Sequence, residues 1–400
     1  MSSLIHLREN KPGRFVLSIF GCRISVTKLV LRLRSCRMRR EQDKAADIDA
    51  WALAENLVVF LLPKRAFISG GVMSIYSLCR TSRELLPGAQ CVLATEPGRM
   101  TYCHNDTFRN SEFVYRWEQV VEAIRRRKGR TIIHVPEYMA AGFAASLTSS
   151  QRNMLKAAQV ELNILNQNMD LMPPPASLTP LFKLTARLTQ TLAFKRNCTQ
   201  ETADAYGMPT HLFSVHIDLS GYSAEPCAEK QKLIAYSPDA APEKEATLES
   251  LRRALPDYEL RQIKDLTFDE YMELIARAFF VISFGEGFDG YYQQPYTVGT
   301  VGLAVYNGVF FPSAAWRDMP GVYASYADMA QGVPQLARAF EADPDAYYSH
   351  IKRVQTARSK VYQKDEYREN LRAFYSGSYH LLPSRYGSAG SCSTQPSSCK

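Results

Sequence analysis

Short apolar runs alternate with amphipathic stretches from about residue 57 onward, and this alternation predicts strands that alternate with helices. The first run, Leu57 to Leu62, has six apolar residues and no polar one, which is typical of a strand buried on both faces. Helical spacing follows from Gly70 to about Leu86, and Ala89 to Thr95 is the next apolar run. Because strands joined through helices pair in parallel, we expect an α/β fold.

The alternation continues to residue 217, stops over the polar residues 219–231, which contain a glycine and a proline, and restarts at residue 232. Such an interruption is typical of a hinge between domains. In the first half we expect further strands at Thr131 to Val135, Val160 to Leu165, Thr189 to Phe194 and His211 to Ile217, and helices at Trp117 to Lys128, Ala144 to Ala158, from Ser177, and Thr199 to Tyr206. In the second half we expect strands at Lys232 to Tyr236, Tyr258 to Ile263, Phe279 to Phe284 and Leu303 to Tyr306, and helices at Glu243 to Leu255 and Asp343 to Tyr375. A further helix should end at Ala278 and begin at a cap formed by Asp265 or Thr267, and Thr267 with Glu270 has the spacing of a capping box.

These patterns divide the 400 residues into four parts. Residues 1–50 are a basic leader, 51–222 an N-terminal Rossmann-like domain, 230–385 a C-terminal Rossmann-like domain, and 386–400, rich in Ser and Gly, a disordered tail. A chain of this length suits two domains.

The segment after the strand Phe279 to Phe284 carries the most chemical information. It contains Gly285, Gly287 and Gly290, with Glu286 among them, and a short helix follows. In an open α/β sheet, ligands bind at loops that leave the carboxyl ends of strands. Glycines let the backbone approach an anion closely, and a helix start offers free N–H groups. This loop therefore predicts a site for a phosphorylated ligand, with a carboxylate beside it.

The net charge of +8 is concentrated at the start of the chain. Residues 1–40 hold ten Lys or Arg and one acid, a charge of +9, so the other 360 residues carry −1. Apolar residues are interleaved with these cations, which is typical of a segment on an anionic membrane surface. The alternative is a solvated leader whose apolar residues cap the first domain. No basic stripe recurs on the folded part, which argues against nucleic acid as a partner.

The nine cysteines are an odd number without a CxxC pair, which favours a reduced, cytoplasmic protein over a disulfide framework or a zinc site. No apolar run approaches the ~18 residues of a membrane span. We therefore expect a cytoplasmic protein, with peripheral attachment at the inner face of the cell membrane if the leader binds lipid.

The motif around Glu286 resembles that of retaining glycosyltransferases of the GT-B fold, of the family 4 type. That family carries Glu-Gly-Phe-Gly, a second Glu with seven residues between the two acids, and a Gly five further on. Here the chain reads Glu286-Gly287-Phe288-Asp289, with Gln294 at the second acid and Gly299 at that Gly. The resemblance extends over residues 57–375. Pro63 to Gly71 is similar to the first-strand loop, which ends in a Gly pair that faces the cleft, and Cys198 to Asp218 is similar to the last helix and strand of the N-terminal domain. Tyr236 to Lys244 is similar to the Pro-Glu-Lys loop, although Ser237-Pro238-Asp239 stands in place of an expected Arg.

The resemblance implies two Rossmann-like domains facing a cleft, and a sugar moved from a nucleotide-sugar donor to a glycan or lipid-linked acceptor in polysaccharide or glycoconjugate biosynthesis. It implies retention of configuration and no cofactor, the nucleotide sugar being a substrate. No Asp-x-Asp follows a strand, since Asp47-Ile-Asp49 precedes the fold and Asp343-Pro-Asp345 stands at a helix start, so we expect no metal. A non-catalytic GT-B relative acting as a binding or partner subunit, or a sugar-nucleotide epimerase, remains an alternative.

The resemblance also suggests roles for individual residues. Glu286 would lie against the donor sugar, and His134, at the end of the third strand, would face the cleft as a second catalytic candidate. The expected donor-binding residues are Lys244, Gly285, Gly287, Phe288, Asp289, Gly290 and Gln294, and the acceptor side of the cleft would hold Gly70, Gly71 and Glu137.

Overall fold

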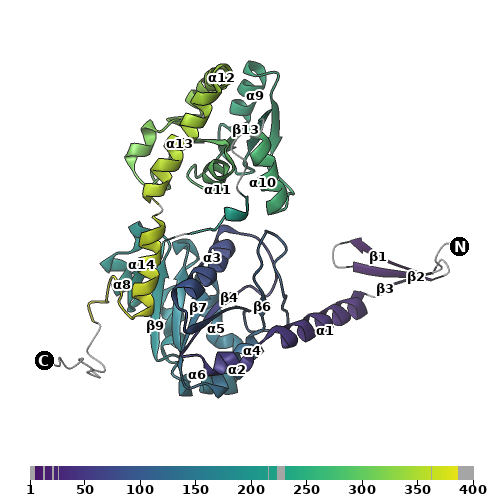
Figure 1. The fold of residues 1–400 in the computed structure, drawn as a ribbon, viewed down its shortest axis with the longest axis vertical. Coiled ribbons are helices and arrows are strands. Elements are labelled where there is room, and N and C mark those ends of the chain that lie inside the picture. Colours follow the sequence, from purple (N-terminus) through teal and green to yellow (C-terminus); the bar gives the residue numbers. More distant parts are fainter. Residues whose placement is uncertain are drawn as a thin grey trace.

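The computed structural model describes residues 5–11, 14–19, 22–25, 27–214, 216–222, 230–361 and 363–385, with side chains from residue 33 onward. Two α/β domains lie one above the other, joined near residue 222 and again near residue 362 (Figure 1). Most of the predicted hinge (223–229) and the predicted tail (386–400) lie outside the described residues.

The N-terminal domain is built on a seven-stranded sheet in the order β10-β9-β8-β7-β4-β5-β6, in which every pair is parallel. Strand β4 lies near its middle, and all its side chains from Leu57 to Leu62 are buried, as the apolar run predicted. The strands are β4 (Asn56–Leu62), β5 (Ala89–Thr95), β6 (Val114–Tyr115), β7 (Arg130–Pro136), β8 (Glu161–Asn166), β9 (Arg187–Leu192) and β10 (Thr210–Leu212).

Helices cover both faces of this sheet. Phe60 of β4 packs in one cluster with Ile75 of α3, and Val59 packs in the other with Trp117 of α4 and Phe143 of α5, because successive side chains of a strand point to opposite faces. The helices are α2 (Ile48–Leu53), α3 (Gly70–Leu85), α4 (Trp117–Arg126), α5 (Glu137–Ser146), α6 (Ser149–Ala157), α7 (Thr179–Phe182) and α8 (Gln200–Tyr206).

The single helix predicted at Ala144 to Ala158 is wrong, because two helices occupy this region. Leu147 is extended (ψ 143°) and ends α5. Thr148 then starts α6 with a reciprocal cap, in which its Oγ1 accepts from the Gln151 N–H at 3.2 Å and the Gln151 side chain accepts from the Thr148 N–H at 3.0 Å.

The C-terminal domain has a five-stranded parallel sheet in the order β12-β11-β13-β14-β15. The predicted capping box is confirmed: Thr267 Oγ1 accepts from the Glu270 N–H at 3.2 Å, and Glu270 Oε2 accepts from the Thr267 N–H at 2.8 Å. The elements are β11 (Gln231–Tyr236), α9 (Lys244–Ala254), β12 (Glu259–Gln262), α10 (Phe268–Arg277), β13 (Ala278–Ser283), α11 (Gly290–Gln293), β14 (Val301–Val305), β15 (Val322–Tyr323), α12 (Tyr326–Ala342) and α13 (Pro344–Val361).

The end of the described chain returns to the N-terminal domain. The predicted helix Asp343 to Tyr375 is two helices, and the second, α14 (Lys364–Tyr375), packs on α3 and β10. Tyr375 Oη lies 2.8 Å from Ser82 Oγ, and the backbones of Leu381 and Thr210 pair in an antiparallel bridge. The predicted domain boundary of 230–385 is therefore corrected, because the chain from α14 onward contacts the first domain.

The leader contains regular structure. Strands β1 (Ile5–Lys11), β2 (Arg14–Ile19) and β3 (Cys22–Ser25) form a small antiparallel sheet, and α1 (Thr27–Ala45) runs from it to the N-terminal domain (Figure 1). The side chain of Gln42 is buried there, and its Nε2 donates to the carbonyls of Tyr102 at 3.1 Å and Val114 at 3.0 Å. The first domain thus begins within α1, and the predicted boundary at residue 50 is too late. Among the helices of the described residues, none is long and apolar enough to cross a membrane.

Candidate functional site

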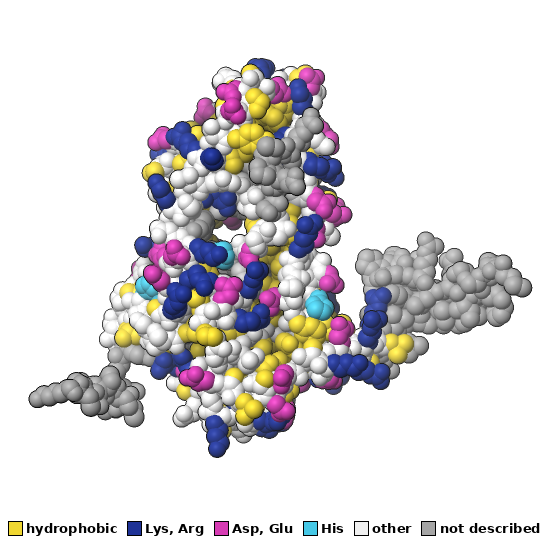
Figure 2. All heavy atoms as spheres, in the orientation of Figure 1, with side chains coloured by type: hydrophobic (Ala, Val, Ile, Leu, Met, Phe, Trp, Pro, Cys, Tyr) yellow, Lys and Arg dark blue, Asp and Glu magenta, His cyan; other side chains and the backbone are white. Residues whose placement is uncertain are grey.

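A cleft of about 520 Å³ lies between the two domains, and Figure 2 shows the opening between them. Both walls come from loops at the carboxyl ends of parallel strands, where an α/β sheet places its ligands. The N-terminal domain contributes Ile68, Ser69, Gly70, Met73 and Ile217, and the C-terminal domain contributes Pro238, Ile263, Lys264, Asp265, Leu266, Thr267, Phe268, Tyr271, Gly290, Tyr291 and Gln294. The predicted residues Gly70, Gly290 and Gln294 thus line one cleft.

The glycine loop leaves β13 in a conformation that depends on its glycines. Gly285 and Gly287 have φ angles of +80° and +82°, which other residues rarely adopt. A Cβ on Gly287 would lie 2.6 Å from the Val305 carbonyl oxygen and 2.9 Å from Phe311 Cε2. The loop therefore packs directly on β14 and the segment after it, and Phe288 is buried against Phe311 and Trp316. Phe288 belongs to the core and does not line the cleft.

Asp289 fixes the start of α11. Its Oδ1 accepts from Ser283 Oγ at 2.9 Å and from the Tyr292 N–H at 3.1 Å. Burial raises the pKa of Asp289 to about 7, and the nearby carboxylates of Asp239 and Glu286 also raise it. This residue has a structural role at the helix start, where the sequence predicted a contact with the donor.

Glu286 is exposed on the same loop, four residues before the cleft-lining Gly290. Its carboxylate makes no hydrogen bond or ion pair with any other residue that the structure describes. Asp239 is also exposed, and its Cβ would lie 3.4 Å from a Cβ placed on Gly285. Two carboxylates therefore flank the loop, so the cation for a diphosphate must come from elsewhere in the cleft.

Lys244 does not supply that cation from its position in the structure. It is buried at the start of α9, and its Nζ donates to the carbonyls of Ser237 and Asp239, both at 2.8 Å. Burial lowers the pKa of Lys244. The prediction that Lys244 contacts the donor is corrected here, because its ammonium holds the loop after β11. Of the described residues that line the cleft, Lys264 is the one cation.

Gln294 folds back over Gly290 inside the cleft. A Cβ on Gly290 would lie 3.2 Å from the Cδ, Nε2 and Oε1 atoms of Gln294, so the amide occupies the space that a side chain would take. The Gln294 amide makes no hydrogen bond within the described part of the chain. One acceptor and two donor hydrogens are thus open to a ligand.

On the opposite wall, the two adjacent glycines of α3 have different roles. Ser69 caps the helix, its Oγ accepting from the Val72 N–H at 3.1 Å, and Gly70 lines the cleft. A Cβ on Gly71 would lie 2.5 Å from Gln167 Oε1, and Gln167 Nε2 donates to the Gly71 carbonyl at 3.2 Å. Gly71 therefore allows the β8 loop to approach α3 and does not face the cleft.

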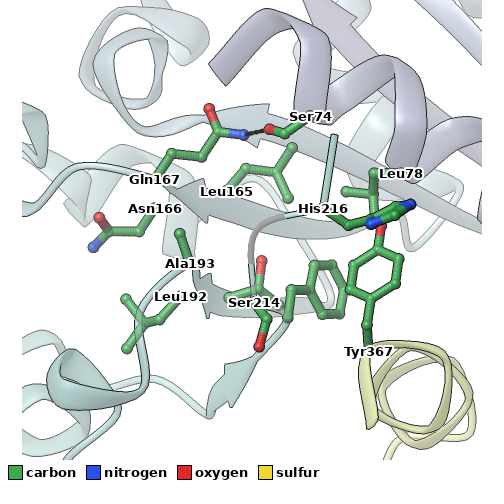
Figure 3. A pocket seen from close by; sticks show the side chains of 12 residues that line it. Ser74, Leu78, Leu165, Asn166, Gln167, Leu192, Ala193, Ser214, His216 and Tyr367 are labelled. Atoms are coloured by element: carbon green, nitrogen blue, oxygen red, sulfur yellow. Dashed lines mark hydrogen bonds between the residues drawn. The ribbon is translucent and has the colours of Figure 1, made fainter. Parts of the chain in front are cut away.

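Figure 3 shows a smaller pocket beside this contact, at the carboxyl ends of β8, β9 and β10. Its volume of about 20 Å³ has room for about one water molecule. Ser214 stands there with φ +66°, and Asn166 Oδ1 is buried without a hydrogen-bond partner in the described residues. The pocket is too small for a sugar, so the site remains in the larger cleft.

The prediction that His134 faces the cleft is wrong. Strand β7 continues to Pro136, so His134 lies inside the sheet and is fully buried. Its Nδ1 accepts from Asn163 Nδ2 at 2.9 Å, its Nε2 lies 3.1 Å from Tyr375 Oη, and its ring stacks on Phe60. Burial lowers the pKa of His134 to about 3. The neutral ring joins α14 to the sheet and has no route to a substrate.

Glu137 is the first residue of α5 and is buried as well. Burial raises its pKa, while the backbone N–H groups of Gln167 and Asn168 lower it. Its Oε2 atom has no hydrogen-bond partner among the described residues. Glu137 thus lies behind the β8 loop and does not line the cleft.

The aromatic wall of the cleft was not predicted from the sequence. Tyr271 is buried and its hydroxyl has no hydrogen-bond partner in the described part of the chain. Its ring packs against two others: the centroid of the Tyr271 ring lies 5.7 Å from that of Tyr291 and 5.5 Å from that of Phe268. The neighbouring Asp265 has a positive φ of +56°. The placement of residues 263–267 after strand β12 could have indicated this loop, since it leaves the carboxyl edge of the sheet.

Two parallel-sheet domains that face one cleft form the GT-B fold, as the resemblance implied. No protein-family model matches the chain, and a comparison with curated proteins found no match. Among solved structures, the chain is similar to a UDP-N-acetylglucosamine 2-epimerase over 82% of this chain and 98% of that one, with 10% identity and a TM-score of 0.44. It is also similar to an α-glucosyltransferase in complex with UDP-glucose and DNA (74% and 93%, 10% identity, TM-score 0.47) and to a UDP-GlcNAc 2-epimerase from Neisseria meningitidis (74% and 93%, 6% identity, TM-score 0.40). Likeness at this level does not identify a reaction.

Proposed function

We propose that this chain is a glycosyltransferase that binds a nucleotide sugar between its two domains and transfers the sugar to a glycan or lipid-linked acceptor. The observation that carries the proposal is the cleft itself, where Gly70 of one domain faces Gly290 and Gln294 of the other, beside a glycine loop that holds Glu286. Its volume of about 520 Å³ is within the range of small-molecule sites.

Each part of a nucleotide sugar has a counterpart in this arrangement. The rings of Tyr271 and Tyr291 offer an apolar surface for the base, and the Gln294 amide suits the ribose hydroxyls. Lys264 and the N–H groups of the glycine loop can meet the diphosphate. Glu286 can accept hydrogen bonds from the hydroxyls of the sugar.

A thermal-shift screen with nucleotide sugars and free nucleotides tests the donor site. A ligand at 100 times its Kd is expected to stabilise the protein by about 2.7 kcal/mol. Gln294→Ala should reduce that stabilisation, because it removes the amide from the cleft. Gln331→Ala, on the exposed side of α12, is the matched control and should behave as wild type. A screen without any shift, or an equal shift in the Gln294 variant, would contradict the proposed donor site.

A non-catalytic relative is the second candidate, because Lys244 is engaged by backbone carbonyls and Ser237-Pro238-Asp239 stands in place of the Arg that the family has. Such a protein would bind a nucleotide weakly and leave the donor unchanged. An epimerase would convert the sugar of the donor without any acceptor. Incubating the donor with and without acceptor, followed by NMR of the sugar, separates the three activities.

We expect sugar transfer to persist in EDTA and the product to keep the anomeric configuration of the donor. Both Asp-x-Asp sequences have capping roles: Asp47 Oδ1 accepts from the Ala50 N–H at 2.9 Å, and Asp343 Oδ1 from the Ala346 N–H at 3.1 Å. Lys264 and N–H groups of the cleft would then stabilise the leaving diphosphate. The measurement is initial rate with chelator, with added Mn²⁺ or Mg²⁺, and NMR of the product. A rate that falls in EDTA and recovers with metal would refute this expectation.

The leader is expected to attach the protein to anionic membranes. Met38, Arg39 and Gln42 contact the N-terminal domain, so a truncation should remove only residues 1–32. These carry six Lys or Arg and one acid. Deleting them should weaken co-sedimentation with anionic vesicles and leave donor binding unchanged. Salt should weaken binding too, because charges are screened within ~8 Å at physiological ionic strength. Equal binding by both proteins would make the leader a solvated arm.

A further inference from the structure

One tyrosine hydroxyl is hydrogen-bonded to both domains. Tyr222 ends the short helix η4 (Ser220–Tyr222), where the chain leaves the N-terminal domain. Its Oη accepts from the backbone N–H of Arg109 at 2.6 Å and donates to Asp269 Oδ1 at 2.6 Å. Arg109 lies in the loop after β5 of the N-terminal domain, and Asp269 in the first turn of α10 of the C-terminal domain. The hydroxyl therefore uses a lone pair on one domain and its hydrogen on the other.

The side chain of Arg109 reinforces this contact. Its Nε lies 3.5 Å from Asp269 Oδ2 and its Nη2 lies 3.4 Å from Glu273 Oε1, and the guanidinium carbon stands 5.2 Å from the centroid of the Tyr222 ring. The three charged side chains are 40–65% exposed, so their ion pairs contribute little. Tyr222 is only 7% exposed, and a short bond to a carboxylate in such a place is stronger. We call Arg109, Tyr222, Asp269 and Glu273 the clasp.

The loop that carries Arg109 is held in place by two asparagines. Asn105 is buried, and its Oδ1 accepts from the N–H of Thr107 at 3.2 Å and from Thr107 Oγ1 at 2.6 Å. Asn110 Nδ2 donates to the carbonyls of Asn105 and Phe108, both at 2.9 Å. These bonds fix the backbone on both sides of Arg109, so its N–H is presented to the Tyr222 hydroxyl in a defined position.

The segment that leads to Tyr222 is fixed to the N-terminal domain as well. Asp218 forms an ion pair with Arg80 of α3 at 2.7 Å, and its N–H donates to Ser77 Oγ of the same helix at 2.9 Å. The N–H of Ser220 then donates to Asp218 Oδ1 at 3.0 Å. Tyr222 is thus positioned by the first domain, and its bond to α10 crosses the gap between the domains.

The clasp stands at the edge of the cleft. Near its start, α10 contributes Phe268 and Tyr271 to the cleft wall. On the other side, a hollow of about 60 Å³ that Arg109 lines shares Met73 and Ile217 with the cleft. With the clasp formed, the two walls enclose about 520 Å³, a volume within the range of small-molecule sites. The clasped arrangement is therefore the one that suits a ligand.

A second polar contact between the domains is more exposed. The guanidinium of Arg196, after β9, donates to the Val309 carbonyl, and both residues are exposed. A single bond between exposed groups is easily replaced by bonds to water. The buried hydroxyl of Tyr222 should therefore contribute more to the relative position of the domains.

We propose that Tyr222 is a positioning residue, which sets the separation of the two domains and keeps the cleft at the width that binds its ligand. Tyr222 is not among the described residues that line the cleft, so it acts through the position of α10. Without the hydroxyl, the domains spend less time in the clasped arrangement, and the apparent affinity falls by that fraction. The proposal rests on the proposed function only for the ligand, because domain separation is measured without one.

The test uses variants of the full-length chain. Tyr222→Phe removes the hydroxyl and keeps the ring. Tyr258→Phe is the matched control, since Tyr258 is also 7% exposed and its hydroxyl donates to Glu341 Oε1 at 3.0 Å within the C-terminal domain. Asp269→Ala removes the acceptor on α10, and Arg109→Ala removes the guanidinium but keeps the N–H. Small-angle X-ray scattering without ligand gives the radius of gyration, thermal melting verifies the fold, and titration with UDP-glucose, GDP-mannose and dTDP-glucose gives affinities.

We expect Tyr222→Phe and Asp269→Ala to have a larger radius of gyration than wild type, Arg109→Ala to change it less, and the control to match wild type. Affinity for the nucleotide sugar that wild type binds should fall about tenfold in the first two variants.

A Tyr222→Phe variant with the radius of gyration of wild type would overturn the proposal, and so would one that is more open but binds nucleotide sugar as tightly as wild type. A lower melting temperature with an unchanged radius would reduce Tyr222 to a structural residue. A wild-type chain that binds none of the three nucleotide sugars would count against the proposed function, while the scattering result still decides whether the clasp sets the domain separation.

Discussion

Glu286→Ala is expected to lower the rate of sugar transfer by at least about 100-fold, the size of effect seen when one preorganised polar group is removed from an active site. The carboxylate is exposed and makes no hydrogen bond or ion pair within the described residues, so no contact of the fold depends on it. Its loss should change the free energy of unfolding by less than about 0.5 kcal/mol. A large kinetic effect without a stability effect is what a substrate-contacting carboxylate produces.

Initial rates with saturating donor and acceptor, together with the melting temperature, give both quantities. Glu245→Ala is the matched control, since it removes an exposed carboxylate from the first turn of α9 and should retain the wild-type rate. Glu286→Gln separates charge from shape, because the amide can still accept a hydrogen bond but loses the charge-assisted part. A Glu286→Ala variant that transfers sugar at the wild-type rate would place the site elsewhere.

The sequence predicted the central strands well because their signal is local. An unbroken apolar run such as Leu57 to Leu62 suits little other than a strand between two layers of helices, and all six side chains are buried. The glycine loop also lies where the sequence placed it, because it follows such a run, and Gly285 and Gly287 in it have positive φ angles.

Long-range contacts were not predicted, because no local pattern encodes them. The apolar and polar spacing of Asp343 to Tyr375 is compatible with one helix. Nothing in this spacing indicates that Tyr375 forms a hydrogen bond with Ser82 of the other domain. The start of the N-terminal domain, within α1, was not predicted for the same reason. Gln42 is polar, yet it is buried, because three polar groups of a later segment surround its side-chain amide.

The same limit explains which site residues were misplaced. Residue type and strand position suggested His134 and Lys244, but burial decides what each can contact. His134 faces α14, a helix that arrives 230 residues later in the chain, and Lys244 meets the carbonyls of its own loop. Gly290 and Gln294 do line the cleft, because a strand, a glycine loop and a helix start define the carboxyl edge of a sheet locally.

Gly287→Ala should have the largest effect on stability of any single change in the glycine loop. The new Cβ would stand 2.6 Å from the Val305 carbonyl oxygen and 2.9 Å from Phe311 Cε2, at a φ of +82°. Left-handed backbone costs about 1–2 kcal/mol for alanine, and overpacking adds about 1–3 kcal/mol. We expect a loss of about 2–4 kcal/mol in the free energy of unfolding of the C-terminal domain, and loss of donor binding as the loop moves.

Gly285 and Gly299 provide controls that share the backbone strain without the clash. Gly285 has φ +80° and its Cβ would meet atoms no closer than 3.4 Å, and Gly299 has φ +68° with no atom within 4 Å. Alanine at either position should therefore cost only about 1–2 kcal/mol. Calorimetry of the three variants, with and without nucleotide sugar, measures stability and donor binding together. If the Gly287→Ala variant has the same melting temperature as the two controls and still binds donor, the close packing of this loop on β14 does not hold it in its binding conformation.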